Sequence, residues 1–385
     1  MGQESQFRRL AGARRSKNSP PIFSQEFIIQ NHGDIVSCFV LVVFAGFMFQ
    51  ISSPIAALLV TPQYNYTEDA VTDPNAEPRT YYVSGLRDIP TVLFYMTCWI
   101  VAHAVVQEYI IDKLQRKLHL SKTKTSKFTE SGHLALFALY SVGHAGYILH
   151  QEHYIPDVTL LWSGYPDRHV EMPLWLKLFY LLQASYWLHQ FPEFYFQKSK
   201  RDEVRSRSLY SILYLILICG AYHLNFTRVG VCMLLLHYLA EFVFHVCRMA
   251  HFAEKSAIAN SGFQLYNILF VIVRLGCVTL AVLTFWYGLR ASEVHSVDIA
   301  TGNYNTTFIR LSCLLVVGGL QAWLMWNFIT FHLRKLREKA AAAKPRYPLR
   351  SKQRKAKKEE KELNSLPEVD QETRRVLRSA SKKKD

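Results

Sequence analysis

FQLYNILFVIVRLGCVTLAVLTFWYGL, residues 263–289, contains a single charged side chain, that of Arg274. An apolar helix of about 20 residues spans the ~30 Å hydrocarbon core of a bilayer, where it satisfies its own backbone hydrogen bonds. Runs of the same kind recur along the chain. Together they predict an all-α polytopic membrane protein with eight transmembrane helices, near residues 35–60, 89–111, 134–149, 174–191, 209–224, 229–247, 263–289 and 308–331. The first span is long enough to tilt or to break at Pro54.

Lys and Arg are distributed unevenly among the segments that join these spans. The N-terminal tail, the segments after the second and fourth spans, and the C-terminal tail are rich in both residues. The opposite segments contain few, namely Arg79, Arg87, Arg168, Arg228 and Arg290. Because the cytosolic segments of membrane proteins carry the excess of Lys and Arg, both termini are predicted to be cytosolic.

Residues 61–88, between the first two spans, form an acidic segment that this orientation places in the lumen. The segment contains the sequon Asn65-Tyr66-Thr67, which makes Asn65 a candidate glycosylation site. Sequons at Asn225 and Asn305 lie on the same side of the membrane. Each is within a few residues of a span, so both are predicted to be poor acceptors.

The two ends of the chain are polar and basic. Residues 1–33 are predicted to be a cytosolic segment, and residues 335–385 a basic, mostly disordered cytosolic tail that begins as a helical extension of the last span. From Arg334 onward there are 19 basic and 8 acidic residues, with Tyr347 as the sole aromatic ring. This composition suits electrostatic contact with the ribosome or with anionic lipids, and DNA is not an expected partner.

Residues 34–120 are predicted to hold the first two spans, the lumenal segment and a helix that continues the second span into the cytosol. In this continuation, residues 107–120, the apolar side chains between Ile110 and Leu118 share one helical face and the basic ones turn away. The pattern is typical of an interfacial helix.

Several predicted spans contain ionisable side chains, which are costly in a bilayer and usually face a bundle interior or a wet cavity. The candidates for a functional role are His103, Glu108, His189, Glu193, His237, Glu241, His245 and Arg274.

His237, Glu241 and His245 recur every four residues and therefore share one helical face. Two imidazoles and a carboxylate could bind a metal ion, but no fourth ligand is evident in the sequence. A catalytic proton relay is a second interpretation. We favour a third, a polar stripe that bonds to other spans, with Glu241 paired to Arg274 or Arg248.

Motifs of common enzyme classes are missing from the sequence. It has no Gly-rich phosphate loop, no nucleophile elbow and no HExxH helix. The seven cysteines all lie within predicted spans, where they are expected to be buried thiols. We therefore expect no catalytic residues, no cofactor and no metal ion.

A set of short motifs follows one order along residues 19–337: Ser19-Pro20-Pro21, Ser24-Gln25-Glu26-Phe27, Gln30-Asn31-His32, Asp34-Ile35-Val36-Ser37-Cys38, His103-Ala104-Val105-Val106-Gln107-Glu108-Tyr109, Ser126-Lys127-Phe128-Thr129-Glu130-Ser131-Gly132, Tyr186-Trp187-Leu188-His189, Phe191-Pro192-Glu193, His237-Tyr238, Glu241-Phe242, Thr301-Gly302-Asn303 and Gln321-Ala322-Trp323. Together they resemble the translocating chain-associated membrane protein (TRAM) family. That family is similar to the wider TLC-domain group. The resemblance implies that residues 121–334, the later six spans, form a TLC-type bundle.

Ceramide synthases, which share the TLC domain, carry a His-His pair upstream of an Arg-x-Gly and, later, a His-Asp-x-x-Asp. Counted back from Arg228, the paired positions of this chain hold Tyr210 and Ser211. The later motif reads His237-Tyr238-Leu239-Ala240-Glu241. With most of the family's acyl-transfer groups replaced, that chemistry is not expected here.

The resemblance implies a non-enzymatic, multi-pass protein of the endoplasmic reticulum membrane. It would sit beside the Sec61 translocon, contact signal sequences and nascent transmembrane segments, and assist their insertion or translocation. The final Lys382-Lys383-Lys384-Asp385 resembles a dilysine retrieval signal, with Lys382 and Lys383 as its lysines, unless it merely ends a basic tail. The alternative is a TLC-type lipid-binding or lipid-modifying membrane protein. A transporter ranks last because no inverted repeat is evident.

Overall fold

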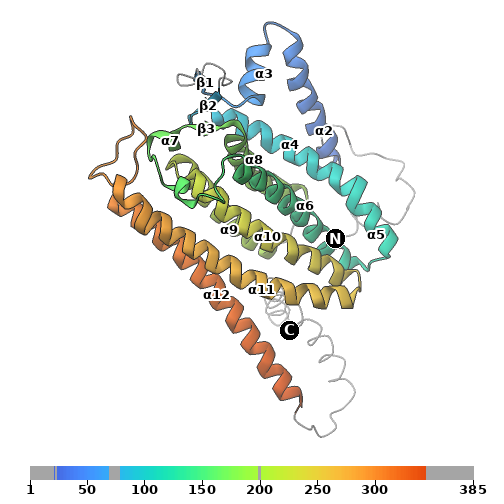
Figure 1. Ribbon diagram of the computed structural model, residues 1–385. Coiled ribbons are helices and arrows are strands. Elements are labelled where there is room, and N and C mark those ends of the chain that lie inside the picture. Colours follow the sequence, from blue (N-terminus) through green and yellow to red (C-terminus); the bar gives the residue numbers. More distant parts are fainter. Residues whose placement is uncertain (1–20, 22–23, 69–78, 198–200, 344–385) are drawn as a thin grey trace.

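The structure is a computed structural model that describes residues 21, 24–68, 79–197 and 201–343. A long helix lies in each region where a span is predicted, and these helices form the layered bundle of Figure 1. In chain order they are α2 (Gln25–Ala45), α4 (Asp88–Val106), α6 (Lys122–Gln151), α8 (Leu174–Phe196), α9 (Arg201–His223), α10 (Thr227–Phe252), α11 (Ser256–Ala281) and α12 (Thr307–Ala343). The all-α polytopic class is confirmed.

Six helices of the described chain are long and apolar enough to cross a membrane: α2, α4 with its continuation, α9, α10, α11 and α12. α6 and α8 are as long but less apolar. α8 lies inside the bundle, where it buries polar residues such as Gln183 and His189 as well as apolar ones. A helix surrounded by protein can carry such groups because neighbouring helices supply partners. The total of eight spans and the side of each terminus stay predictions.

The first predicted span, residues 35–60, is not one helix. α2 begins earlier, at Gln25, with the Ser24 hydroxyl accepting from the Phe27 amide at 3.1 Å. After a 3-10 turn, η1 (Gly46–Met48), the chain reverses and α3 (Ser53–Val60) runs back beside α2 (Figure 1). Pro54 lies in the first turn of α3, where its missing amide hydrogen is tolerated. The chain therefore breaks near Pro54, and a single tilted span is wrong.

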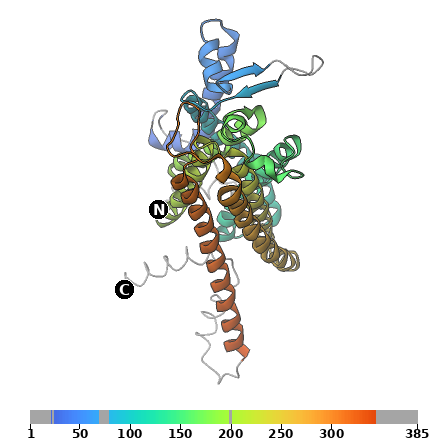
Figure 2. The same ribbon diagram turned by 60° about the vertical axis from the view of Figure 1, so that its left-hand side comes forward.

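One end of the bundle carries a small antiparallel sheet, and we call it the sheet end. β1 (Asn65–Glu68) pairs with β2 (Arg79–Tyr82), which pairs with β3 (Met172–Pro173). The 3-10 helix η3 (Val158–Leu161) and α7 (Asp167–Val170) lie at the same end (Figure 2). The sheet thus joins the segment before α4 to the segment before α8.

The opposite end carries the connection between α10 and α11, residues 253–255, and we call it the turn end. There α4 continues through a π-helical turn, η2 (Gln107–Ile111), into α5 (Asp112–Leu118). Ile111 packs with Phe128 and Phe252, whereas Ile110 and Leu114 are exposed. The apolar face predicted for an interfacial helix is thus split between the bundle and its surroundings.

Aromatic and amide side chains hold α6, α8, α9 and α10 together. The Trp187 indole stacks on the Tyr214 ring with 3.8 Å between centroids, and its Nε1 donates to the Tyr238 hydroxyl at 3.1 Å. Tyr238 donates to the Gln183 carbonyl at 2.7 Å, and the Gln183 amide donates to Ser141 at 2.8 Å. A connected buried network of this kind specifies one arrangement, since any slip would leave polar groups unpaired. It therefore fixes how α10 is rotated in the bundle.

α12 has 37 residues and is about 55 Å long, so it extends past the other helices at the turn end (Figure 2). At the sheet end it is anchored to the continuation of α11, the π-helical η4 (Val282–Tyr287) and 3-10 η5 (Gly288–Ser292). Arg310 donates to the Phe285 carbonyl at 2.7 Å and pairs with Glu293 at 2.7 Å. One end of α12 is thus fixed, while the other projects beyond the bundle.

Candidate functional site

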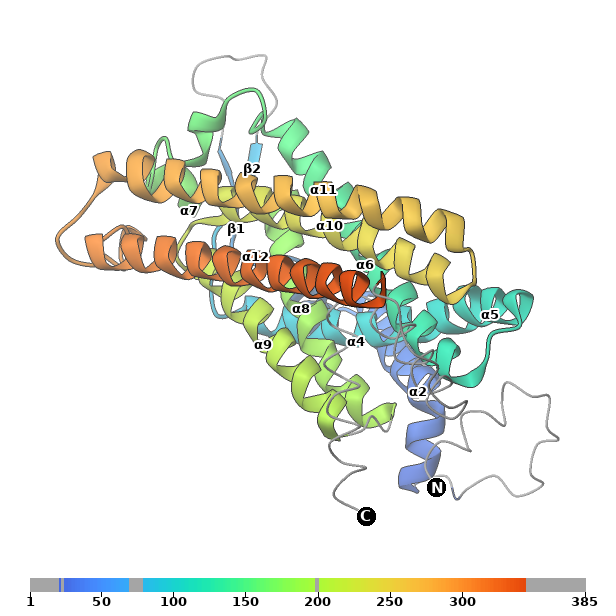
Figure 3. The ribbon, with the colours of Figure 1, turned by 90° about the horizontal axis from the view of Figure 1, so that it is seen from below.

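A long cavity runs through the bundle and is lined by α6, α8, α9, α10, α11 and α12. Its volume is about 1330 Å³. On α12 its lining extends from Ser312 to Lys339, roughly 40 Å of helix. We call this cavity the α9–α12 groove, after the two helices whose exposed side chains line its rims. Figure 3 shows the course of these two helices along the bundle.

The groove opens sideways between its rims. On α9, Tyr210 and Ile216 line it although 45% and 62% of their surfaces are exposed. On α12, Trp323 lines it and is 57% exposed. Side chains that face both a cavity and the outside mark an opening. In a chain that spans a membrane, this opening faces lipid.

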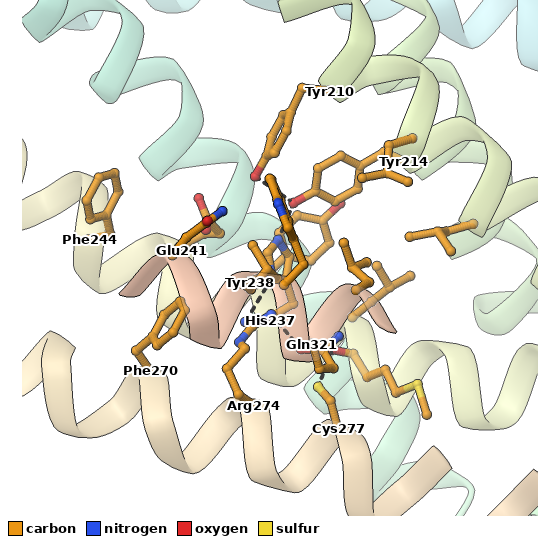
Figure 4. A pocket seen from close by; sticks show the side chains of 18 of the residues that line it. Tyr210, Tyr214, His237, Tyr238, Glu241, Phe244, Phe270, Arg274, Cys277 and Gln321 are labelled. Atoms are coloured by element: carbon orange, nitrogen blue, oxygen red, sulfur yellow. Dashed lines mark hydrogen bonds between the residues drawn. The ribbon is translucent and has the colours of Figure 1, made fainter. Parts of the chain in front are cut away.

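Four side chains from four helices meet in the groove, and we call Tyr214, His237, Arg274 and Gln321 the groove cluster (Figure 4). Arg274 donates to His237 Nδ1 at 3.2 Å and to Gln321 Oε1 at 2.9 Å. Because a guanidinium only donates, His237 Nδ1 must accept. The neutral imidazole then carries its proton on Nε2 and donates it to the Tyr214 hydroxyl.

Arg274 is a buried cation held by neutral partners. It is 3% exposed, its guanidinium lies 5.0 Å from the Phe270 ring centroid, and its Nε has no hydrogen-bond partner. The predicted pairing with Glu241 is wrong, because Glu241 lies 3.3 Å from His245 on its own helix.

Arg248 is not the partner of Glu241 either, since it pairs with Glu130 of α6 at 3.4 Å. Within the described residues, no carboxylate lies within ion-pair distance of Arg274.

The three α10 residues at four-residue spacing behave differently from one another. His237 bonds to α9 and α11, as a polar stripe requires, whereas Glu241 and His245 contact each other. In the described part of the chain no group of three His, Cys, Asp or Glu side chains is placed to hold a metal ion.

The polar lining of the groove covers about half its length. Between the groove cluster and the turn end it includes Asn260, Gln264 and Asn267 of α11 and Asn327 of α12. Toward the sheet end the lining becomes apolar, where Phe226, Val229, Phe285 and Cys313 pack together. A side chain entering from the turn end therefore meets polar partners as far as Arg274 and hydrocarbon beyond it.

Basic side chains surround the mouth of the groove at the turn end. Arg207 of α9 lies over the Phe194 ring at 4.8 Å, and Arg248 of α10 pairs with Glu130. Lys335 and Lys339 of α12 also line the mouth. Two acidic residues are among the described residues that line the groove, Glu130, which pairs with Arg248, and Glu241, which contacts His245. Basic side chains are therefore in excess at the mouth.

A second set of polar residues lies apart from the groove, between α4, α6 and α8. We call His103, His133, His189 and Glu193 the histidine cluster. The rings of His103 and His133 stack at 3.6 Å, and His103 Nε2 lies 3.4 Å from Glu193 Oε1. His189 bonds to the carbonyl of Tyr186 on its own helix. None of the four lines the groove, so the cluster braces α4 against the bundle.

The remaining candidates lie elsewhere. Glu108 is exposed on η2 and joins neither cluster. Asn65 is exposed at the start of β1, at the sheet end. Asn225 and Asn305 are 3% and 0% exposed, and their side-chain amides donate to carbonyls. Both would therefore be poor glycan acceptors. Lys382 and Lys383, with the rest of the tail after Ala343, lie outside the described residues.

Sequence reasoning missed an ion pair at the sheet end. Lys177 of α8 is fully buried, with Nζ 2.8 Å from Asp88 Oδ1 and 2.7 Å from each of the Gln63 and Val83 carbonyl oxygens. A signal was present, since a lysine inside an apolar run requires a partner. The second predicted span begins just after Asp88, at the same end of the membrane.

Comparison with known proteins agrees with the motifs. Residues 127–330 match the TLC domain, a range that includes the whole groove cluster. Translocating chain-associated membrane protein 2 of Homo sapiens is 44% identical over 346 residues, 88% of this chain and 91% of that protein. Its namesake in Mus musculus is 46% identical over 326 residues, 84% and 86% of the two chains.

A more distant relative is the sphingosine N-acyltransferase-like protein FUM17 of Gibberella moniliformis, which is 25% identical over 181 residues, 46% of each chain. The likeness to the two proteins named for translocating chains is both higher and nearly full-length. The chain therefore belongs to the translocating chain-associated membrane protein family, within the TLC-domain group.

Proposed function

We propose that this protein is an accessory component of the protein translocation machinery of the endoplasmic reticulum. It contacts signal sequences and nascent transmembrane segments beside the Sec61 channel and assists their insertion or translocation, without catalysing a reaction. Membership of the family supports this role. The observation that carries it is the α9–α12 groove, which offers polar partners at depth through a sideways opening.

A polar side chain is costly in lipid. A charged residue at the centre of an inserting span costs about 2.5–3.5 kcal/mol. In this proposal the segment lies along the rims of the groove and its polar side chain reaches inward. If the groove residues offset about 1.4 kcal/mol, the insertion equilibrium changes about tenfold. Weakly hydrophobic segments therefore benefit, while strongly hydrophobic ones need no help.

The groove residues and the histidine cluster have different roles in this proposal. Glu241 and Arg274 line the groove and can face a client segment. His103 and His189 belong to the histidine cluster, so apolar replacements there act through the stability of the bundle. Glu108 is exposed at the surface and can contact a client without the groove.

Photo-crosslinking tests the contact. A photoreactive amino acid at Leu213, which lines the groove, is compared with one at Leu315, which is 77% exposed and does not line it. Ribosome-bound chains carry a weak signal with one polar residue at mid-span, or its apolar counterpart. We expect adducts from Leu213 with the polar signal and few from Leu315. Equal adducts from both positions would refute contact at the groove.

Insertion kinetics test the assistance. Membranes that contain Glu241→Leu should insert the weak signal more slowly and the strong signal at the normal rate. Membranes without the protein set the lower limit of the effect. Equal slowing of both signals would argue against a sheltering role, provided that the variant melts at the wild-type temperature.

A second candidate function is a lipid-binding or lipid-modifying role. The observation in its favour is that Tyr210, His237 and Glu241, at the positions that correspond to acyl-transfer motifs, all line the same groove. Incubation of the purified protein with a sphingoid base and acyl-coenzyme A separates the two functions. An N-acylated product would favour the enzyme.

A further inference from the structure

We propose that the α9–α12 groove binds one anionic glycerophospholipid, with its phosphate at the turn-end mouth and one acyl chain inside the groove. The lipid is held and not converted. The inference does not depend on the proposed role in translocation, because it rests on the charge and shape of the groove alone.

The charge of the mouth selects an anionic head group. Lys335 and Lys339 have no carboxylate partner within the described residues, and Lys335 lies 6.0 Å from the Phe331 ring centroid. Arg207 rests over an aromatic ring, and the one acidic side chain at the mouth, Glu130, is already paired with Lys127 and Arg248. In the predicted orientation this end faces the cytosol, where the membrane leaflet is rich in anionic lipid.

The length of the groove suits an acyl chain. From Arg207 at the mouth to Gly220 on the same helix is 13 residues, or about 20 Å. The distance from the head-group level of a bilayer to its midplane is also about 20 Å, half of the ~40–45 Å total. A chain that hangs from a phosphate at the mouth would therefore end near Gly220.

The wall of the groove suits hydrocarbon along that path. On the α9 side the lining consists of Leu209, Leu213 and Leu217, and on the α12 side of Leu320, Leu324 and Phe328. Polar side chains of α10 and α11, such as His237 and Arg274, line the wall opposite these apolar residues, and Tyr214 of α9 and Gln321 of α12 meet them there.

Binding is measured on the full-length protein in nanodiscs by native mass spectrometry after exchange with phosphatidylserine or phosphatidylcholine. The double variant Lys335→Gln with Lys339→Gln removes two charges from the mouth. The control, Arg334→Gln with Arg337→Gln, removes two charges from the same helix outside the groove. We expect phosphatidylserine to bind the first variant roughly 30-fold more weakly, at about 1 kcal/mol for each lysine, and the control like wild type.

A steric variant tests the acyl-chain path. A Cβ at Gly220 would meet nothing within 4 Å, so Gly220→Phe fills the inner groove without a backbone clash. Gly319 on α12 is equally open but does not line the groove, which makes Gly319→Phe the matched control. Gly220→Phe should lose long-chain phosphatidylserine and keep a short-chain form, and Gly319→Phe should retain both.

Several outcomes would overturn the proposal. They are equal binding of phosphatidylcholine, equal loss in both charge variants, unchanged long-chain binding in Gly220→Phe, or displacement of the lipid by inorganic phosphate alone. Wild-type melting temperatures for all variants ensure that a loss of lipid reports on the groove and not on unfolding.

Discussion

Replacing Lys177 with Met tests whether the sheet end depends on one buried ammonium group. The Lys177 side chain is fully buried, and its Nζ contacts Asp88 and two backbone carbonyls. One carbonyl, that of Gln63, lies before β1, and the other, that of Val83, lies after β2. Methionine has nearly the same length but no charge and no donor. The substitution therefore leaves one buried carboxylate without its counter-ion and two carbonyls without a donor.

The expected cost follows from these contacts. Breaking one side of a buried ion pair costs about 3–5 kcal/mol. Asp88 keeps two other donors, the Tyr222 hydroxyl at 2.8 Å and the Gly85 amide at 3.0 Å, so we expect the lower part of that range, about 3 kcal/mol. At about 2 °C per kcal/mol for a chain of this size, the melting temperature should fall by roughly 6 °C.

The assay is thermal unfolding in detergent. Unfolding is monitored by the reaction of a fluorogenic maleimide with thiols that are buried in the folded protein, such as Cys232 and Cys277. Adding Asp88→Asn to Lys177→Met removes the unpaired carboxylate charge and should recover part of the lost melting temperature. If the two residues were independent, the destabilising effects of the two substitutions would instead add. Lys113→Met, at an exposed position, is the control. A Lys177→Met protein that melts within 1 °C of wild type (roughly 0.5 kcal/mol) would refute the reasoning.

Three further predictions concern other parts of the chain. Burial lowers the pKa of His169, which lies in α7 outside the spans, to about 3. Below pH 6.5 this imidazole is therefore protonated in the unfolded chain and stays neutral in the folded one. Stability should then fall by about 2 kcal/mol from pH 7.5 to pH 5, and thermal unfolding of His169→Phe should lack this part of the pH dependence. Gly230→Ala should destabilise the folded protein by roughly 1–3 kcal/mol, because the added Cβ would lie 2.2 Å from the Tyr180 hydroxyl oxygen. Gly220→Ala is the control, because its Cβ would enter open space. Equal melting temperatures for the two variants would contradict this prediction. Asn65→Gln should abolish a glycosidase-sensitive gel shift, and a persisting shift would place the glycan elsewhere.

Much of the fold was predictable because its signals are local. A long apolar run such as residues 263–289 identifies a helix whatever its neighbours are, and the long helices do lie in the predicted regions. The first span was predicted only in part, because Pro54 marked a break as one of two alternatives and the sequence could not choose between them. Its apolar run was continuous, but the reversal before Pro54 depends on how α3 packs back against α2, and hydropathy carries no record of that contact.

The sequence predicted which residues belong to the candidate site, but it did not predict which residues they bond to. His237, Glu241, His245 and Arg274 were all recognisable as ionisable residues in apolar spans. Their spacing along α10 could not show that Glu241 contacts His245, nor that Arg274 turns toward Gln321. Those choices depend on which face each helix presents to its neighbours.

The sequence by itself determined that this chain is a helical membrane protein with a biased distribution of charge, because burial in lipid and the positive-inside tendency are properties of single segments. The tertiary structure alone decided that α9 and α12 stand apart, that a polar groove opens between them, and that a buried arginine there is held by an imidazole and an amide. The physical reason is that hydrogen-bond partners and cavities are set by helix rotation and separation, which arise from packing across the whole bundle and are not encoded in any one span.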